Sequence, residues 1–282
     1  MNTVCIIGAG ELGGAVAHAL ARGERVARVV LIDAAGEIAA GKALDIQQSG
    51  AVEGFHTQLA GTDDPTRATA CTVCVIADRA AQPPIEWHDD EGLAMLAHLV
   101  PSLGDAPVVF AGASQSGLLL AAAREGGVRR ERLIGSAPEA FAAAVISMVA
   151  MEARCSPGEV QLTVLGAPPA GFVVPWSEAS IGGYTLERVL SQVQLTRLDA
   201  RVARLWPPGP YALGLAAARV VEALVTSSRR TRTVLAVLGG EFGVRGRVGA
   251  LPALLSTTGI VHTRVPTLNT RERVQLETAL GA

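Results

Sequence analysis

The first stretch that could carry out chemistry is the glycine-rich turn Gly8-Ala9-Gly10-Glu11-Leu12-Gly13, between an apolar run and a helical stretch. A G-x-G-x-x-G spacing in that setting is typical of dinucleotide-binding proteins. Gly8 would permit the tight turn, Gly10 the approach of a pyrophosphate, and Gly13 the close packing of helix on strand. The start of the helix would offer free N–H groups and a partial positive charge to phosphates.

An acidic residue follows this turn at the distance that a dinucleotide site requires. Asp33 lies 20 residues after Gly13, at the end of a second apolar run. A carboxylate there accepts both ribose hydroxyls of an adenosine and repels the 2′-phosphate of NADP. The sequence therefore predicts NAD as the cofactor. The predicted contacts from this region are Gly8, Gly10, Glu11, Leu12, Gly13 and Asp33.

The elements that position the turn alternate between strands and helices. The patterns predict strands over 3–7, 26–32, 56–60, 72–77, 107–112 and 131–135, with helices over 11–22, 34–48, 87–103 and 115–126. Residues 79–84 are expected to form a loop. Such alternation indicates an α/β fold with a doubly wound parallel sheet. We assign residues 1–135 to a dinucleotide-binding Rossmann domain.

The second half has a different pattern. Helices are predicted over 137–154, 186–206, 211–226 and 270–280, and strands over 233–238 and 259–265. Segments 159–166 and 171–176 are expected to pair around a proline-containing turn. Helices together with antiparallel strands favour an α+β domain over residues 136–282.

Composition narrows the class of protein. Of the 282 residues 49% are hydrophobic and 18% charged, which allows a sizeable core. The net charge of −2 gives no electrostatic reason to expect nucleic acid or an anionic membrane as a partner. Apolar stretches are interrupted by glycine or charge, so no transmembrane helix is expected. Because Met1 leads almost directly into a core strand, we expect no signal peptide and a cytoplasmic protein.

The cysteines have a spacing that could indicate metal or redox chemistry. Cys71 and Cys74 form a C-x-x-C pair inside an apolar run, and Cys5 and Cys155 lie elsewhere. On a strand, residues three apart point to opposite faces. We therefore expect two buried core cysteines and no metal site.

Several segments of the sequence resemble those of a known enzyme family. The chain resembles the lactate/malate dehydrogenases nearly from end to end. The matching segments are GAGELG with Asp33, GKALDI, VEGF, GTDD, RERLIG, AMEARCSPGEVQLTVLG, VPWSEASIGG and the final LNTRE. The resemblance implies a Rossmann domain followed by an α+β substrate domain, dimers or tetramers, and reduction of a 2-keto acid with NADH or the reverse. It also implies that Ala77, Arg79 and Gly112 lie beside the cofactor. Lys42 and Asp45 are expected to serve packing and a subunit contact rather than chemistry.

The family's chemistry requires a small set of polar groups. A His exchanges the hydroxyl proton, an Asp orients that His, an Asn binds the hydroxyl oxygen, and Arg side chains bind the substrate carboxylate and polarise the carbonyl. In this chain Pro168 replaces the His, Phe141 replaces the Asp, and Ala113 replaces the Asn. The three Arg positions hold Ala144, Gln82 and His88. We therefore expect an apolar pocket without fixed positive charge, in which a substrate carboxylate would be buried unpaired.

Two residues near this pocket leave alternatives open. Arg79 replaces a glycine of the loop after the fourth strand. It would either pair with the diphosphate or fill the groove and pair with Asp33 or Asp78. His88, followed by Asp89, is either a relocated acid/base or a solvated side chain.

Three functions remain in competition. The first is an NAD(H)-binding protein of this family that has lost hydroxy-acid chemistry and acts as a sensor, scaffold or partner subunit. The second is an active oxidoreductase on a less charged carbonyl or alcohol, using His88, Glu86 or Ser114. The third is a structural or regulatory partner subunit without cofactor. A homodimer or homotetramer and a small-molecule ligand in the apolar pocket are the expected partners.

Overall fold

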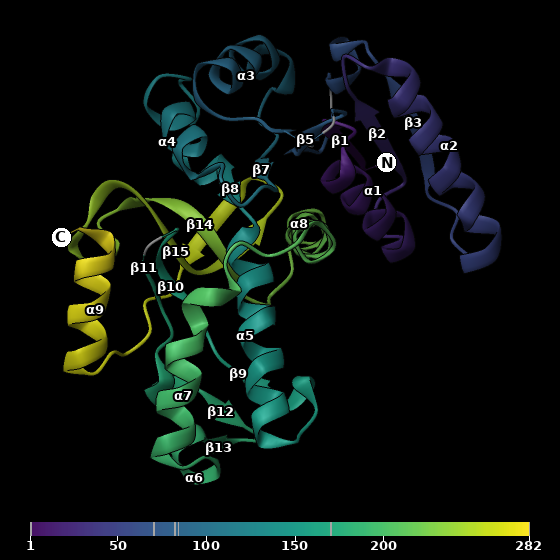
Figure 1. Cartoon of the computed structure of the whole chain (residues 1–282). Helices are drawn as coiled ribbons and strands as arrows, with labels where there is room; N and C mark the ends of the chain where they lie inside the picture. Colours follow the sequence, from purple (N-terminus) through teal and green to yellow (C-terminus); the bar gives the residue numbers. More distant parts are fainter. Residues whose placement is uncertain (1, 70, 82, 84, 170, 282) are drawn as a thin grey trace.

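A large mixed sheet runs through the molecule (Figure 1). The computed structural model describes residues 2–69, 71–81, 83, 85–169 and 171–281. Within them the strand order is β11-β10-β15-β14-β8-β7-β4-β1-β2-β3, and β16 pairs with β15. The section from β8 to β3 is parallel, and the rest is antiparallel.

The parallel section has the strand order of a doubly wound dinucleotide-binding fold, as the sequence predicted. Its strands are β1 (Thr3–Ile7), β2 (Arg28–Ile32), β3 (Gln58–Thr62), β4 (Val73–Ile76), β7 (Val108–Phe110) and β8 (Leu133–Gly135). Its helices are α1 (Glu11–Gly23), α2 (Gly36–Glu53), α3 (Asp89–Leu103) and α4 (Ser116–Arg124). Side chains alternate along the strands, so α1 and α2 cover one face and α3 and α4 the other.

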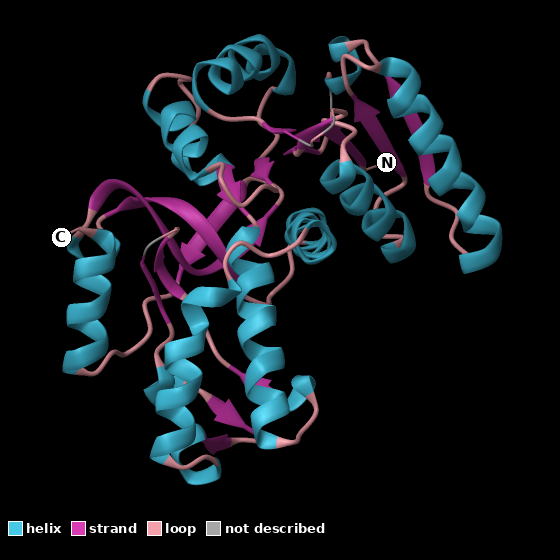
Figure 2. Ribbon diagram, viewed as in Figure 1, coloured by secondary structure: helices cyan, strands magenta, loops and turns pink. Residues whose placement is uncertain are grey.

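The second half is α+β. Its helices are α5 (Ala137–Ala153), α6 (Leu186–Val189), α7 (Gln192–Val202), α8 (Pro210–Thr226) and α9 (Thr270–Leu280). Its strands are β9 (Val160–Gln161), β10 (Leu165–Ala167), β11 (Gly171–Val173), β12 (Ser180–Ile181), β13 (Tyr184–Thr185), β14 (Arg232–Gly239), β15 (Arg245–Ser256) and β16 (Gly259–Thr263). Helices α5 to α7 and the small sheet β13-β12-β9 form the lower lobe in Figure 2.

Short 3-10 helices join these elements. They are η1 (Pro65–Ala68), η2 (Arg130–Arg132), η3 (Pro157–Glu159), η4 (Trp176–Glu178), η5 (Ala203–Leu205) and η6 (Glu241–Gly243). Two helices of the second half begin with a capping box, in which side chain and backbone satisfy each other's free N–H groups. These are Ser191 with Gln194 before α7 and Asn269 with Glu272 before α9.

Several predicted elements needed correction. Residues 79–84 are not only a loop, because β5 (Asp78–Arg79) and β6 (Ile85–Glu86) pair as an antiparallel hairpin. Segments β10 and β11 pair as expected, whereas β9 joins β12 instead. The twelve-residue strand β15 was missed, because its glycines and Pro252 have low strand propensity. Its pairing with both β14 and β10 overrides that propensity.

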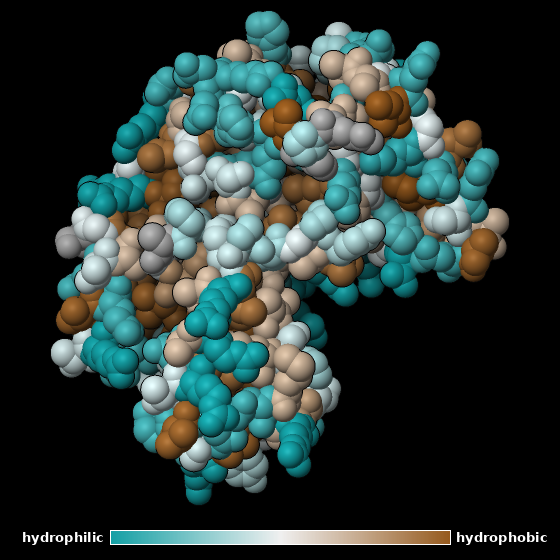
Figure 3. Space-filling model, viewed as in Figure 1, coloured by the Kyte–Doolittle hydropathy of each residue, from teal (hydrophilic) through white to brown (hydrophobic). Residues whose placement is uncertain are grey.

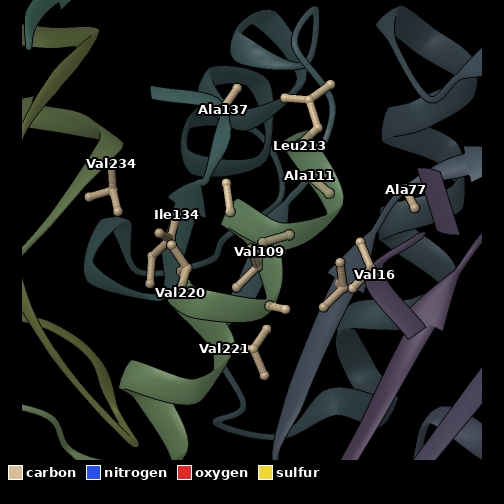
Figure 4. Packing of buried hydrophobic residues seen from close by; sticks show 14 of the residues in the cluster. Val16, Ala77, Val109, Ala111, Ile134, Ala137, Leu213, Val220, Val221 and Val234 are labelled. Carbon is tan, nitrogen blue, oxygen red and sulfur yellow. The ribbon is translucent and has the colours of Figure 1, made fainter. Parts of the chain in front are cut away.

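Helix α8 of the second half packs against the Rossmann half. Its Val220 and Val221 lie among side chains such as Val16 of α1 and Val109 of β7 (Figure 4). A Cβ on Gly214 would lie 2.6 Å from the Cβ of Ala15, so the absence of a side chain permits close helix contact. Because the sheet also continues from β8 to β14, the division at residue 135 stays a prediction.

The surface is mixed in character. Hydrophobic residues are scattered among hydrophilic ones over the face shown in Figure 3. None of the described helices combines the length and hydropathy that crossing a bilayer needs.

Candidate functional site

The turn between β1 and α1 has the backbone geometry that its glycines predicted. Gly8 adopts a φ of +110°, and its N–H donates to the carbonyl of Ile32 over 2.7 Å. A Cβ on Gly13 would overlap the carbonyl oxygen of Gly8, so the helix can approach the strand only with glycine there. The ammonium of Lys42 donates to the carbonyl oxygen of Gly10 over 2.5 Å. Lys42 therefore braces the turn, a role that sequence reasoning missed.

The start of α1 binds a carboxylate of the chain itself. Asp78 accepts from the N–H of Gly13 at 2.8 Å through Oδ1 and from the N–H of Leu12 at 3.1 Å through Oδ2. Its side chain is buried, and a Cβ on Gly10 would overlap its carboxylate. The space expected for a pyrophosphate beside Gly10 therefore holds Asp78.

Asp33 joins three loops at the carboxyl ends of the strands. Its Oδ2 accepts from the N–H groups of Ala9 and Ala80, each at 2.8 Å, and its Oδ1 accepts from Ala35 at 2.9 Å. The side chain is only 8% exposed. Asp33 thus lies where the sequence placed it, with its carboxylate already bound to the backbone.

One cavity lies beside Asp33. This Asp33 cavity has a volume of about 540 Å³, with Ile7, Ile32, Met95 and Leu99 among its apolar lining residues. Asp33, Thr66, Arg79 and Trp87 supply polar groups and an aromatic ring. The cavity suits a flat apolar group attached to a hydroxylated one.

Arg79 pairs with neither Asp33 nor Asp78, the partners that one of the two alternatives gave it, and its pairing with a diphosphate stays a prediction. It forms an ion pair with Glu91, and its guanidinium lies 4.8 Å from the centre of the Trp87 ring. Arg79 and Asp78 are adjacent in β5, and successive side chains of a strand point to opposite faces. The hairpin therefore directs Asp78 to the turn and Arg79 to the Asp33 cavity.

A second cavity corresponds to the predicted apolar pocket. This Pro168 cavity has a volume of about 450 Å³. Its apolar lining consists of Leu12, Ala113, Pro168, Pro169, Trp206, Pro207, Pro208, Pro210 and Leu213. Its polar lining consists of Glu11, Asp78, Glu86, Ser114 and Ser116. Among the described residues that line it none is Arg, Lys or His. The sequence analysis considered Glu86 as a reactive group, whereas the carboxylates of Glu11 and Asp78 were not expected in this pocket.

Glu86 binds the loop after β7. It accepts from the N–H of Ala113 at 3.1 Å and from the N–H and hydroxyl of Ser114 at 2.9 and 2.5 Å. A Cβ on Gly112 would overlap this carboxylate. Gly112 and Ala113 therefore contact Glu86, which occupies the place expected for a ligand.

The remaining predicted positions lie in different surroundings. Phe141 is fully buried, stacked on Phe172 with ring centres 4.3 Å apart and 5.8 Å from Trp206. Ala144 is half-buried on the same helix. His88 is exposed at the start of α3, with its Nδ1 3.1 Å from Asp89, and it lines neither cavity.

Ala77 and Gln82 are the remaining predicted site residues. Ala77 is buried beneath the β1–α1 turn, where its N–H donates to the carbonyl of Ile7 over 2.9 Å. Gln82 lies outside the described residues.

Cys71 and Cys74 are buried in the core as expected, as is Cys5, whereas Cys155 is half-buried; the geometric reason given from sequence was wrong. Cys71 precedes β4 rather than belonging to it, and its thiol contacts both Cys5 and Cys74. Hydrogen bonds from these two thiols lower the pKa of Cys71, whereas bonding to Cys71 and burial raise the pKa of Cys5 and Cys74. In the described part of the chain, no three His, Cys, Asp or Glu side chains are grouped as metal ligands.

Known proteins resemble this chain over nearly its whole length. No protein-family model matches the chain. Malate dehydrogenase from Thioalkalivibrio sulfidiphilus is 28% identical, covering 100% of this chain and 97% of that protein. Malate dehydrogenase from Salinibacter ruber is 25% identical, covering 99% and 93%.

Solved structures show the same fold. The structure of the Salinibacter ruber enzyme has a TM-score of 0.88 at 24% identity, covering 99% of this chain and 94% of that one. Lactate dehydrogenase from Cryptosporidium parvum, complexed with lactic acid and NAD, has a TM-score of 0.89 at 20% identity, covering 99% and 95%. The chain is a two-part α/β protein with a Rossmann half. Over nearly its whole length it is similar in sequence to malate dehydrogenases, and in fold to lactate and malate dehydrogenases.

Proposed function

We propose that this chain is an NAD(H)-binding member of the lactate/malate dehydrogenase family that does not interconvert 2-hydroxy and 2-keto acids. The observation that carries the proposal is the lining of the Pro168 cavity. Pro168 and Ala113 stand there in place of the family's His and Asn, beside three carboxylates. A 2-keto acid would meet negative charge and no described cation, which strongly disfavours its burial.

Pro168, which stands in place of the family's His, also lacks a side-chain group for proton transfer. Proline has no side-chain nitrogen that can accept a proton. The place of the orienting Asp is taken by Phe141, whose ring is stacked on Phe172 inside the core. A polar side chain in place of Phe141 would lose that packing.

NAD(H) as the cofactor is supported by the Rossmann fold, the glycine-rich turn and the position of Asp33. A relative with the same fold has been solved with NAD bound. The residues proposed to lie along the cofactor are Gly8, Gly10, Glu11, Leu12, Gly13, Asp33, Ala77, Arg79 and Gly112. We also propose a cytoplasmic homodimer or homotetramer, because relatives of this family are generally oligomeric.

An active oxidoreductase on a less charged carbonyl or alcohol is the second candidate. The hydroxyl of Ser114 donates to Glu86 over 2.5 Å inside the Pro168 cavity, which provides an acid/base pair next to apolar walls. His88 is not part of this candidate, since it lines neither cavity. The third candidate, a partner subunit without cofactor, is favoured by the Asp78 carboxylate at the start of α1.

Two measurements on the purified chain test the proposal. Calorimetry with NADH should give saturable binding that weakens in Asp33→Ala, with Asp33→Asn as a variant of matched volume. NADH oxidation with oxaloacetate or pyruvate should stay at background, and turnover of about 1–1000 per second would contradict the proposal. NADH oxidation with apolar aldehydes that is lost in Glu86→Gln would favour the second candidate. Absence of binding at millimolar NADH would favour the third.

A further inference from the structure

The carboxylate of Asp78 and a diphosphate would compete for the same donors. The N–H groups of Leu12 and Gly13 have no partner within α1, because they lie in its first turn. Both donate to Asp78, at 3.1 and 2.8 Å. The helix dipole favours one anion at this end. A second anion would be repelled by the first and would find these N–H groups taken.

The backbone around Asp78 fixes it in this position. The N–H of Gly10 donates to the carbonyl oxygen of Asp78 over 3.0 Å. The missing side chains of Gly8 and Gly10 leave space for the Asp78 backbone and carboxylate respectively. The glycines that would admit a pyrophosphate thus admit an aspartate of the same chain.

Asp78 also lies between the two cavities. It lines the Pro168 cavity, and the next residue in β5, Arg79, lines the Asp33 cavity. The N–H of Ala80 then donates to Asp33 over 2.8 Å, which holds this strand across the groove. A dinucleotide would have to run through the position of the Asp78 side chain.

The Asp33 cavity keeps the features that suit an uncharged nucleoside. Its lining includes the Asp33 carboxylate, which can accept a further hydrogen bond beside the three it receives from the backbone, together with apolar walls for a base and the ring of Trp87. Two buried nitrogens of its lining, Arg79 Nε and Trp87 Nε1, have no hydrogen-bond partner among the described residues. None of these features depends on a phosphate.

We propose that Asp78 is a built-in substitute for the diphosphate, so that the chain binds an uncharged adenine nucleoside in the Asp33 cavity in preference to ligands that carry a diphosphate. The proposal rests on the proposed function, in which the Asp33 cavity is the adenosine end of the cofactor groove. NAD(H) binds only to molecules in which the Asp78 carboxylate has left Leu12 and Gly13, which lowers its apparent affinity.

Three ligands and two matched variants test the proposal by calorimetry on the full chain. Adenosine, ADP and NADH are titrated into the wild type, Asp78→Ala and Glu86→Gln. Each variant removes one carboxylate from the same hairpin, but Glu86 binds Ala113 and Ser114 rather than α1. The wild type should bind adenosine more tightly than ADP. Asp78→Ala should tighten ADP and NADH by about tenfold or more, since charge-assisted hydrogen bonds are freed.

The expected affinities distinguish the role of Asp78 from the binding of NAD(H) itself. Adenosine affinity should stay the same in all three proteins, and Glu86→Gln should leave ADP affinity unchanged. If Asp78→Ala does not fold, Asp78→Asn removes the charge at the same volume. Tighter ADP than adenosine in the wild type, unchanged by either Asp78 variant, overturns the role of Asp78 and leaves NAD(H) binding intact. Failure of all three ligands with every protein overturns both proposals.

Discussion

Asp78 and Glu86 lie directly opposite each other on β5 and β6, yet each binds a different loop of the Rossmann half. Asp78 accepts from the first turn of α1, and Glu86 accepts from Ala113 and Ser114 before α4. Both loops follow parallel strands, at the edge where such sheets bind their ligands. One hairpin therefore delivers two carboxylates to the two positions where a cofactor would use backbone N–H groups.

We predict that Gly10→Ala destabilises the protein through Asp78. The new Cβ would overlap the Asp78 carboxylate, so the side chain must leave its two donors at a cost of about 1–3 kcal/mol. Urea unfolding measures the free energy. In the background of Asp78→Ala, the same substitution should cost about 1 kcal/mol less. Additive effects of the two substitutions would contradict the contact.

We predict that Phe141 holds the second half together rather than acting in catalysis. Phe141→Ala should lower the free energy of unfolding by about 3–5 kcal/mol, because it leaves a cavity beside Phe172 and Trp206. Phe141→Asp, which restores the family's carboxylate, should destabilise the protein without producing turnover. Ala143→Ser, at an exposed position of the same helix, is the matched control. A stable, active Phe141→Asp would show that this interpretation is wrong.

We predict that Trp87 reports on ligands in the Asp33 cavity. Its ring lines the cavity and packs beneath the Arg79 guanidinium, so an adenosine bound there changes its surroundings. Tryptophan emission should change with adenosine in the wild type and lose that change in Trp87→Phe. The signal should persist in Trp176→Phe, since Trp176 lies in the second half and donates to Asp199 over 2.9 Å. A signal that follows Trp176 instead would place the ligand elsewhere.

We predict that Glu241 makes stability depend on acid pH. Burial alone would raise the pKa of Glu241. The N–H groups of Gly239 and of Glu241 itself, together with Arg130, outweigh burial and hold the pKa below its usual 4.5. A carboxyl with a lowered folded pKa stabilises the protein above pH 4.5 and loses that contribution as pH falls through the folded pKa.

Unfolding of Glu241→Gln between pH 3 and 7 checks this dependence. The wild type should exceed the variant by about 1 kcal/mol at pH 7 and lose most of that advantage at the acid end. Asp45→Asn, at an exposed position in the middle of α2, provides a comparison. If the difference in unfolding free energy between wild type and Glu241→Gln is constant with pH, Glu241 does not contribute to the loss of stability in acid.

Most of the Rossmann half could be predicted because its signals are local. The glycine turn, the apolar runs and Asp33 each lie within a short window of sequence, and they were enough to predict the doubly wound parallel sheet. The hairpin could not be predicted in the same way, because its strands have two residues each and are specified by contacts with distant loops. One signal was available: Asp78 follows the strand next to the glycine turn, and the ends of adjacent parallel strands meet.

The second half was harder to predict for a related reason. Strand β15 forms although glycine and proline interrupt it, because neighbours pair with it on both sides. Glu86 was considered as an acid/base group, but nothing in its spacing indicated that Ala113 and Ser114 would bind it. The positions proposed to replace the family's catalytic groups could be named from sequence, whereas the meeting of Glu11, Asp78 and Glu86 in one cavity appears only once the chain is folded.

The packing of α8 on α1 limits which substitutions this chain can tolerate. Val220 and Val221 of α8 belong to the same core as Val16 and Val109, and β14 covers the edge of β8 through the pair Leu235 and Gly135. Cut off from these contacts, the Rossmann half would expose a helix face and a strand edge to water, a known route to aggregation. Substitutions in the second half are therefore tolerated only where they preserve its packing on the Rossmann half.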